Sequence, residues 1–271
     1  DPWLRAYFDY ARKNPVVGEV VSFDATLSTE PCNTKAIQSY IWNFGDLNIP
    51  SVYVPTITHV FAAPGTYTVT LTLWYEDFTS GSLSTDIYVS KEPYLKVEPT
   101  TVNVKLLHSN VQVNVTLNDL DAYQRVAAVQ FRLLYNSTLL RFKNMTEGPF
   151  IQSFAAHGTF FSYALYEVDP IFGSNVIAAV LMMPNDTGYW SPPFPSGTGV
   201  IATINFEAIY QERGLEKPVQ TFDLTLIETI LLDSDGNEVP HSKMDGVCNV
   251  YPTHIADINY DGKVDVRDYY T

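Results

Sequence analysis

The chain has 271 residues, which is enough for two ordinary domains that each bury a core. Its formal net charge of -14, from 16 basic and 30 acidic residues, argues against nucleic acid or anionic lipid as a partner and suits a protein that meets divalent cations. The longest apolar run, Val176–Met183, is too short to cross a bilayer, so this segment is not expected to insert into a membrane.

Alternation of apolar and polar residues dominates the chain, whereas helical periodicity is almost absent. In Val111–Leu117 the valines and Leu117 are expected to face inward, with Gln112, Asn114 and Thr116 outward. In Val200–Phe206 the same alternation predicts an inward set. Its members are Val200, Ala202, Ile204 and Phe206. Short strands separated by Gly, Pro, Asn and Asp clusters predict an all-β protein made of two consecutive β-sandwiches.

Residues 1–90 form the first predicted domain. Its expected strands are Ala6–Tyr10, Val20–Asp24, Ile37–Phe44, Ile57–Phe61, Thr66–Tyr75 and Asp86–Ser90. Trp42 and Phe44 alternate toward a core, and Gly45-Asp46 and Pro64-Gly65 are turns. The blocks Val17–Asp24, Tyr40–Asp46 and His59–Val69, in this order, resemble the polycystic-kidney-disease (PKD) domain, which implies an Ig-like spacer or adhesive module. Asp46 is expected to accept a backbone hydrogen bond in its turn, with metal ligation as the alternative.

Residues 91–93 are a short linker with a proline, and residues 94–252 form the second predicted domain. The segments Val126–Phe142, Gly197–Phe206 and Asp233–Pro240 resemble the cohesin family, which implies a jelly-roll sandwich. Asn136 stands where that family usually has Asp. The patterns that carry this resemblance are shared with carbohydrate-binding sandwiches.

Three features of the second domain allow a structural and a functional interpretation. Asp233, Asp235 and Glu238 are expected in a hairpin turn, with a metal cluster as the alternative. The aromatic residues of Phe154–Tyr166 are expected in the core, with a sugar-stacking platform as the alternative. The Pro-rich loop Met183–Gly199 carries three aromatic residues that are candidates for contact with a partner. They are Tyr189, Trp190 and Phe194.

The C-terminal segment 253–271 carries the most specific motif, the twelve residues from Asp257 to Asp268. Oxygen ligands on alternate residues and a glycine at the sixth position are what a loop that wraps Ca²⁺ requires. The predicted ligands are Asp257, Asn259, Asp261, the Lys263 carbonyl, Asp265 and Asp268. An acidic turn without metal is the alternative.

The pattern D-x-N-x-D-G-x-V-D-x-x-D resembles the calcium loop of dockerin modules and covers about half of one. Dockerins carry two loops and bind cohesins, so the resemblance implies that this loop needs a partner surface. We expect residues 257–271 to dock on the cohesin-like sandwich of another copy, head to tail, which would generate a ring or filament. Docking within the same chain is the alternative.

Covalent modifications are also predicted. Four N-x-[ST] sequons make Asn114, Asn136, Asn144 and Asn185 candidates for glycosylation. Cys32 and Cys248 are candidates for one disulfide between the two domains, because an oxidising compartment disfavours free thiols.

Catalytic motifs are missing from the sequence: it has no G-x-S-x-G, no H-E-x-x-H and no phosphate loop. We therefore expect a non-enzymatic extracellular protein of a cell surface, as in modular archaeal or bacterial surface proteins. It would assemble through calcium-dependent cohesin/dockerin-like contacts with copies of itself or with a partner protein, into a filament or surface layer. The alternative is a series of carbohydrate-binding or spacer modules of a larger secreted enzyme, with polysaccharide as the ligand.

Overall fold

The structure is a computed structural model that describes residues 6–11, 13–28, 36–104, 109–169, 173–209 and 219–251. The chain divides into two compact units, and the boundary between them falls after Glu92, inside the predicted linker. The calcium loop from Asp257 to Asp268, and Cys32, lie outside the described residues. No helix in the described ranges is both long enough and apolar enough to span a membrane.

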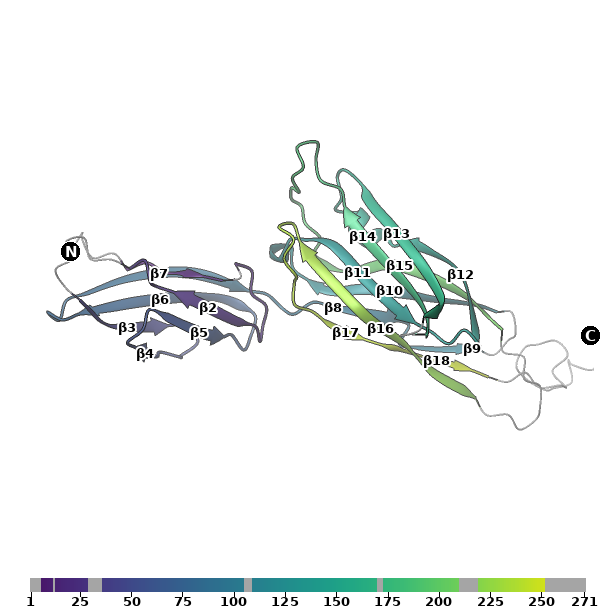
Figure 1. Ribbon diagram of the computed structural model, residues 1–271, viewed down its shortest axis with the longest axis horizontal. Coiled ribbons are helices and arrows are strands. Elements are labelled where there is room, and N and C mark those ends of the chain that lie inside the picture. Colours follow the sequence, from purple (N-terminus) through teal and green to yellow (C-terminus); the bar gives the residue numbers. More distant parts are fainter. Residues whose placement is uncertain are drawn as a thin grey trace, which may run out of the picture. The chain divides into compact units, whose positions relative to one another are not determined.

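The first unit is a sandwich of two antiparallel sheets (Figure 1). One sheet has the order β1 (Asp9–Tyr10), β2 (Val20–Asp24), β5 (Thr56–Val60). The other has the order β4 (Ser51–Val52), β3 (Ile37–Asn43), β6 (Gly65–Tyr75), β7 (Ser80–Val89). The predicted strands are present, although β1 is shorter than expected and β7 begins earlier than expected. The first residues of β7 are a Ser-rich run with low strand propensity, and hydrogen bonding to β6 stabilises them as a strand.

The core of the first unit is aromatic, as the alternation in β3 predicts. Trp42 and Phe44 are fully buried, and their rings are parallel with centroids 6.1 Å apart. Asp46 accepts a hydrogen bond from the Asn48 backbone N–H at 3.1 Å, which confirms the predicted turn. Its other oxygen lies 2.7 Å from Nε2 of His59, which stacks on Phe44 at 3.9 Å, so this carboxylate also holds a buried imidazole in place.

The second unit is a larger sandwich of two sheets (Figure 1). The five-stranded sheet has the order β12 (Leu140–Glu147), β15 (Gly197–Ala208), β10 (Asn110–Leu120), β8 (Tyr94–Glu98), β17 (Ser242–Met244). The six-stranded sheet has the order β13 (Thr159–Asp169), β14 (Gly173–Met182), β11 (Val126–Leu134), β16 (Gln220–Asp233), β18 (Gly246–Val250), β9 (Thr101–Val104). A 3₁₀ turn η1 (Ala122–Gln124) precedes β11, and one short helix α1 (Pro149–Gln152) packs on β15.

One inward-facing residue was assigned wrongly from the alternation in β15. A register shift lies where Val115 pairs with Ala202 and Thr116 with Val200, so Ile201 is an extra residue in a β-bulge. Ile201 is fully buried, while Val200 is half-exposed and lies opposite the outward-facing Thr116. The bulge depends on pairing with β10, so its position is not predicted by the apolar–polar alternation of β15 alone.

Cys248 lies on β18 and its side chain is fully buried among the apolar residues between the two sheets. Burial raises the pKa of this thiol to about 11, so it stays protonated and unreactive at neutral pH. The disulfide to Cys32 stays a prediction, because Cys32 is outside the described ranges.

Candidate interaction surface

Two outer faces of the second sandwich differ in chemistry. On each sheet alternate residues point into the core, so the intervening residues form an outer face. We call the outer face of β13, β14, β11 and β16 the apolar face. Its residues are Phe160, Ser162, Ala164, Tyr166, Asn175, Ile177, Ala179, Leu181, Ala128, Gln130, Arg132, Leu134, Thr225, Ile227, Ile230 and Leu232.

Strand register places these residues in rows that cross the four strands. The first row runs Phe160, Leu181, Ala128, Leu232. The second runs Ser162, Ala179, Gln130, Ile230, and the third runs Ala164, Ile177, Arg132, Ile227. Asn175 is fully buried, and the other side chains on this face are half-buried by their neighbours or exposed, with Phe160 at 58% and Tyr166 at 45%. An apolar sheet face with side chains exposed to solvent is a candidate surface for binding another protein.

Arg132 of β11 supplies a cation to the apolar face, and residues of three other strands hold its side chain. Its Nε donates to Oε2 of Glu228 on β16 at 2.8 Å, and Nη1 donates to Oδ1 of Asn175 on β14 at 2.8 Å. Its guanidinium carbon lies 5.5 Å from the ring centroid of Tyr166 on β13. The Arg132 side chain is therefore fixed before a partner arrives, which lowers the entropy cost of using it in an interface.

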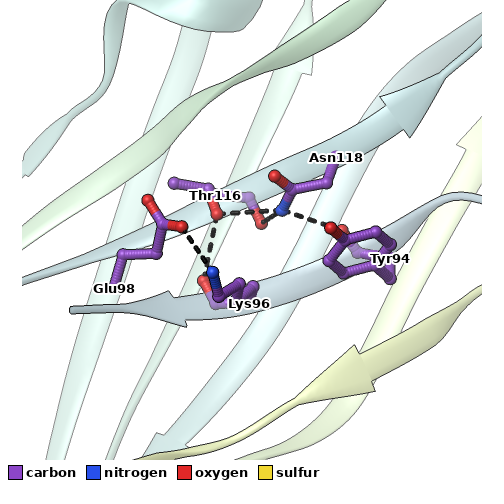
Figure 2. Close-up of polar contacts among 5 residues, drawn as sticks. All are labelled: Tyr94, Lys96, Glu98, Thr116 and Asn118. Carbon is purple, nitrogen blue, oxygen red and sulfur yellow. Dashed lines mark hydrogen bonds and ion pairs between the residues drawn. The ribbon is translucent and has the colours of Figure 1, made fainter. Parts of the chain in front are cut away.

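The outer face of the five-stranded sheet, which we call the polar face, has the opposite character. Figure 2 shows one part of it, where Lys96 donates to Glu98 at 2.7 Å and Asn118 donates to Thr116 Oγ1 at 2.9 Å. The hydrogen bond to Glu98 raises the pKa of Lys96, so its ammonium stays charged at neutral pH. Amides, hydroxyls and ion pairs that satisfy one another leave little to gain from burying this face.

The sequons are split between the polar face and loops. Asn114 and Asn144 lie on the polar face, where they accept hydrogen bonds from Thr203 and Asn205, each at 2.8 Å. Asn144 is exposed, and Asn114 points outward as predicted.

The other two sequon asparagines close turns of the same kind. Asn136 follows β11 and Asn185 follows β14, and each accepts a hydrogen bond from the Thr hydroxyl of its own sequon at 2.7 Å. Asn136 also accepts from the Thr138 backbone N–H at 2.9 Å. An amide oxygen closes this turn as a carboxylate would, so the departure from the family's Asp does not disturb it.

The acidic hairpin is a structural turn, as predicted. Asp233 Oδ1 accepts hydrogen bonds from the backbone N–H groups of Asp235 and Asn237, both at 2.8 Å, and Gly236 has a φ of +82°. Asp235 pairs with Arg125 at 2.9 Å. Across the described ranges, no three His, Cys, Asp or Glu side chains are grouped so as to hold a metal ion.

The aromatic residues that sequence analysis singled out are not all where it placed them. Phe154 and Phe161 pack against the core as expected, but Phe160, Tyr163 and Tyr166 are exposed by 58%, 42% and 45%, which corrects the core assignment for those three. They lie on β13, which is an edge strand of its sheet and has a neighbour on one side only in the described part of the chain.

The Pro-rich loop presents one exposed aromatic side chain. Tyr189 is 72% exposed, whereas Phe194 is buried beneath Arg125. Trp190 is half-buried and its indole N–H donates to the Met182 carbonyl at 2.9 Å. Trp190 is therefore engaged in packing, and a polysaccharide platform built on it stays untested.

The fold and its open sheet face define a class: a pair of β-sandwiches, the second of which is an interaction module. Residues 9–89 match the PKD domain model and residues 95–250 match the cohesin domain model. The cohesin match covers more than half of the chain, which therefore belongs to the cohesin family. Both domain types are non-catalytic interaction modules, and cohesin domains mediate protein–protein assembly.

Solved structures of cohesins are similar to part of this chain. A non-cellulosomal cohesin from Archaeoglobus fulgidus shares 17% identity, with 59% of this chain and 91% of that chain covered and a TM-score of 0.43. A cohesin in a type I cohesin–dockerin complex from Clostridium thermocellum shares 17% identity, with 59% and 100% covered and a TM-score of 0.44. The sixth cohesin of scaffoldin B from Acetivibrio cellulolyticus, solved with a dockerin, gives the same figures, 17%, 59%, 100% and 0.44. No curated protein matches the sequence significantly.

Proposed function

We propose that this chain is an extracellular assembly protein whose cohesin domain binds a calcium-loaded, dockerin-type loop module through the apolar face. The observation that carries the proposal is the open apolar face with the fixed Arg132 near its centre. A small calcium-binding loop has little apolar surface of its own and must pack against another surface to repay its ordering entropy. The chain's own residues 253–271 supply such a loop to a second copy.

The polar face also supports the apolar face as the docking surface, because two predicted glycosylation sites lie on the polar face. Glycans on Asn114 and Asn144 would cover the polar face and leave the apolar face on the other sheet open. The expected setting is a cell surface, where millimolar calcium fills weak sites.

The docking proposal predicts that a labelled peptide of residues 253–271 binds the full chain in millimolar calcium. The receptor is the full-length Asp261→Ala variant, so that its own loop does not compete for calcium. Ala179→Arg, in the second row of the apolar face, should weaken binding about 100-fold, because docking would bury an unpaired charge. Fluorescence anisotropy measures the affinity.

Gln112→Arg is the matched control, since it adds the same charge to an exposed position of the polar face. It should leave peptide binding unchanged. Equal binding in calcium and in chelator, or equal loss in both arginine variants, would count against the proposal.

The calcium loop is tested separately. Wild-type chain should take up one more Ca²⁺ per chain than Asp261→Ala, because this carboxylate occupies the fifth position of the twelve-residue loop. Native mass spectrometry at millimolar calcium counts the ions, and Asp235→Ala in the hairpin turn of β16 is the control. Identical ion counts for wild type and Asp261→Ala would show that the loop binds no calcium.

A further inference from the structure

We propose that the free edge of β13 is a self-association site, at which two copies of the chain join their six-stranded sheets by antiparallel strand pairing. The pairing does not depend on the calcium loop or on the docking function proposed above. Its basis is the position of β13 in the sheet and the chemistry of its residues.

β13 leaves one edge open. Thr159–Tyr166 pairs residue by residue with β14, from Thr159 opposite Met182 to Tyr166 opposite Asn175. No other strand of the described ranges pairs with β13 (Figure 1). Alternate backbone N–H and C=O groups of an edge strand point away from its one neighbour, so they can pair with another strand.

The other long strands at sheet margins carry charged residues along their length, whereas the charged residues of β13, Glu167 and Asp169, are confined to its end. β12 has Arg141 and Lys143 on its eight residues. On the ten residues of β7 the exposed positions are mostly serines, with Asp86 among them. In contrast, Thr159–Tyr166 contains no charged residue and no proline. Natural edge strands are usually protected by charge, proline or shortness, so a long neutral edge indicates a partner strand.

Large aromatic or apolar side chains of β13 are exposed on both sides of the strand. Phe160 and Tyr166 belong to the apolar face, and they are exposed by 58% and 45%. Tyr163 and Leu165 point toward the other sheet, yet they remain exposed by 42% and 37%. Pairing along this edge would cover apolar surface above and below the strand, in addition to its backbone groups.

A second copy is the partner because the segment is complementary to itself. With a twofold axis at Tyr163, antiparallel pairing sets Phe160 opposite Tyr166 on one face and Phe161 opposite Leu165 on the other. Aromatic and large apolar pairs directly opposite each other stabilise antiparallel strands. The nearest acidic residue, Glu167, would lie opposite Thr159, so no like charges meet.

This pairing has a consequence for assembly. A twofold axis perpendicular to the sheet keeps the apolar faces of both copies on the same side of one continuous sheet. Two docking faces side by side would bind a bivalent partner more tightly than either face would bind it alone. This consequence rests on the proposed docking function, whereas the strand pairing itself does not.

Charge-swap variants of the full chain test the pairing. Ser162 and Ala164 are exposed, and in the expected register Ser162 of one copy lies opposite Ala164 of the other. Wild type should sediment as a dimer at micromolar concentration in chelator. The double variants S162K/A164K and S162E/A164E should each have a dimer dissociation constant raised at least about tenfold, and their equimolar mixture should recover the dimer.

The matched control is N110K/Q112K, which adds the same charges to exposed positions of β10 on the polar face and should remain dimeric. Circular dichroism checks that each variant is folded. A wild-type chain that stays monomeric, or a dimer that S162K/A164K leaves intact, would overturn the proposal. A dimer that forms only with calcium and residues 257–271 would support tail docking and would also overturn strand pairing.

Discussion

Replacing Trp42 by alanine should lower the free energy of unfolding of the PKD domain by about 3–5 kcal/mol. The Trp42 side chain is fully buried, and its ring contacts Phe8 and Phe23 at centroid distances of 5.2 and 5.6 Å. Alanine would leave a cavity between two sheets that are both anchored by backbone hydrogen bonds and cannot collapse to fill it. Chemical denaturation measures the change in the free energy of unfolding. It is followed by far-ultraviolet circular dichroism, which does not need the tryptophan that the variant lacks.

Trp42→Phe separates packing from polarity. The Trp42 Nε1–H is buried and has no hydrogen-bond partner in the described part of the chain, so removing it recovers a desolvation penalty. Phenylalanine should therefore cost less than half as much as alanine. Equal losses for the two variants would show that ring packing does not stabilise this core. The cohesin domain, which is a separate compact unit, should keep its own transition in both variants.

Gly148→Ala should have the largest effect in the cohesin domain, about 3 kcal/mol or more. A Cβ atom at Gly148 would lie 2.2 Å from the Val200 carbonyl oxygen, which belongs to the backbone of β15 and cannot rotate away. The Gly148 N–H also donates to the Ile201 carbonyl at 2.7 Å, which holds the strand end against the bulge. Thermal denaturation of the full chain should show a lower midpoint for the cohesin transition alone.

Gly246→Ala is the matched control for this substitution. There the added Cβ would meet Cγ1 of Val97 at 2.8 Å, and a valine methyl group can shift where a carbonyl oxygen cannot. Gly246→Ala should therefore destabilise the domain by less than Gly148→Ala. The reverse order would mean that the backbone of β15 moves readily at its bulge.

Local patterns in the sequence predicted the strands and the inward residues well where one face of a strand is buried. Trp42 and Phe44 were identified as core residues from alternation alone, and both are fully buried. The turns at Asp46 and Asp233 were also predicted, because their side chains bond to backbone groups only two residues away. Such features depend on neighbours along the chain, so the sequence contains them directly.

Features that depend on neighbours across a sheet were missed. Alternation placed Val200 in the core, but the bulge at Ile201, which forms only in pairing with β10, moved it outward. Aromatic residues of β13 were assigned to the core because of their size. They are exposed because β13 is an edge strand of its sheet, and the sequence of a single strand does not determine its position within the sheet.

The sequence by itself determined the all-β class, the two consecutive sandwiches, the PKD and cohesin resemblances and the candidate calcium loop, because alternation, turn chemistry and ligand spacing are local. Only the tertiary structure decided that Arg132, Glu228, Asn175 and Tyr166 meet on one apolar face, and that β13 has an open edge. These residues lie on four strands that extend from β11 to β16 in the chain, and only the register of the strands within the sheet brings their side chains into contact.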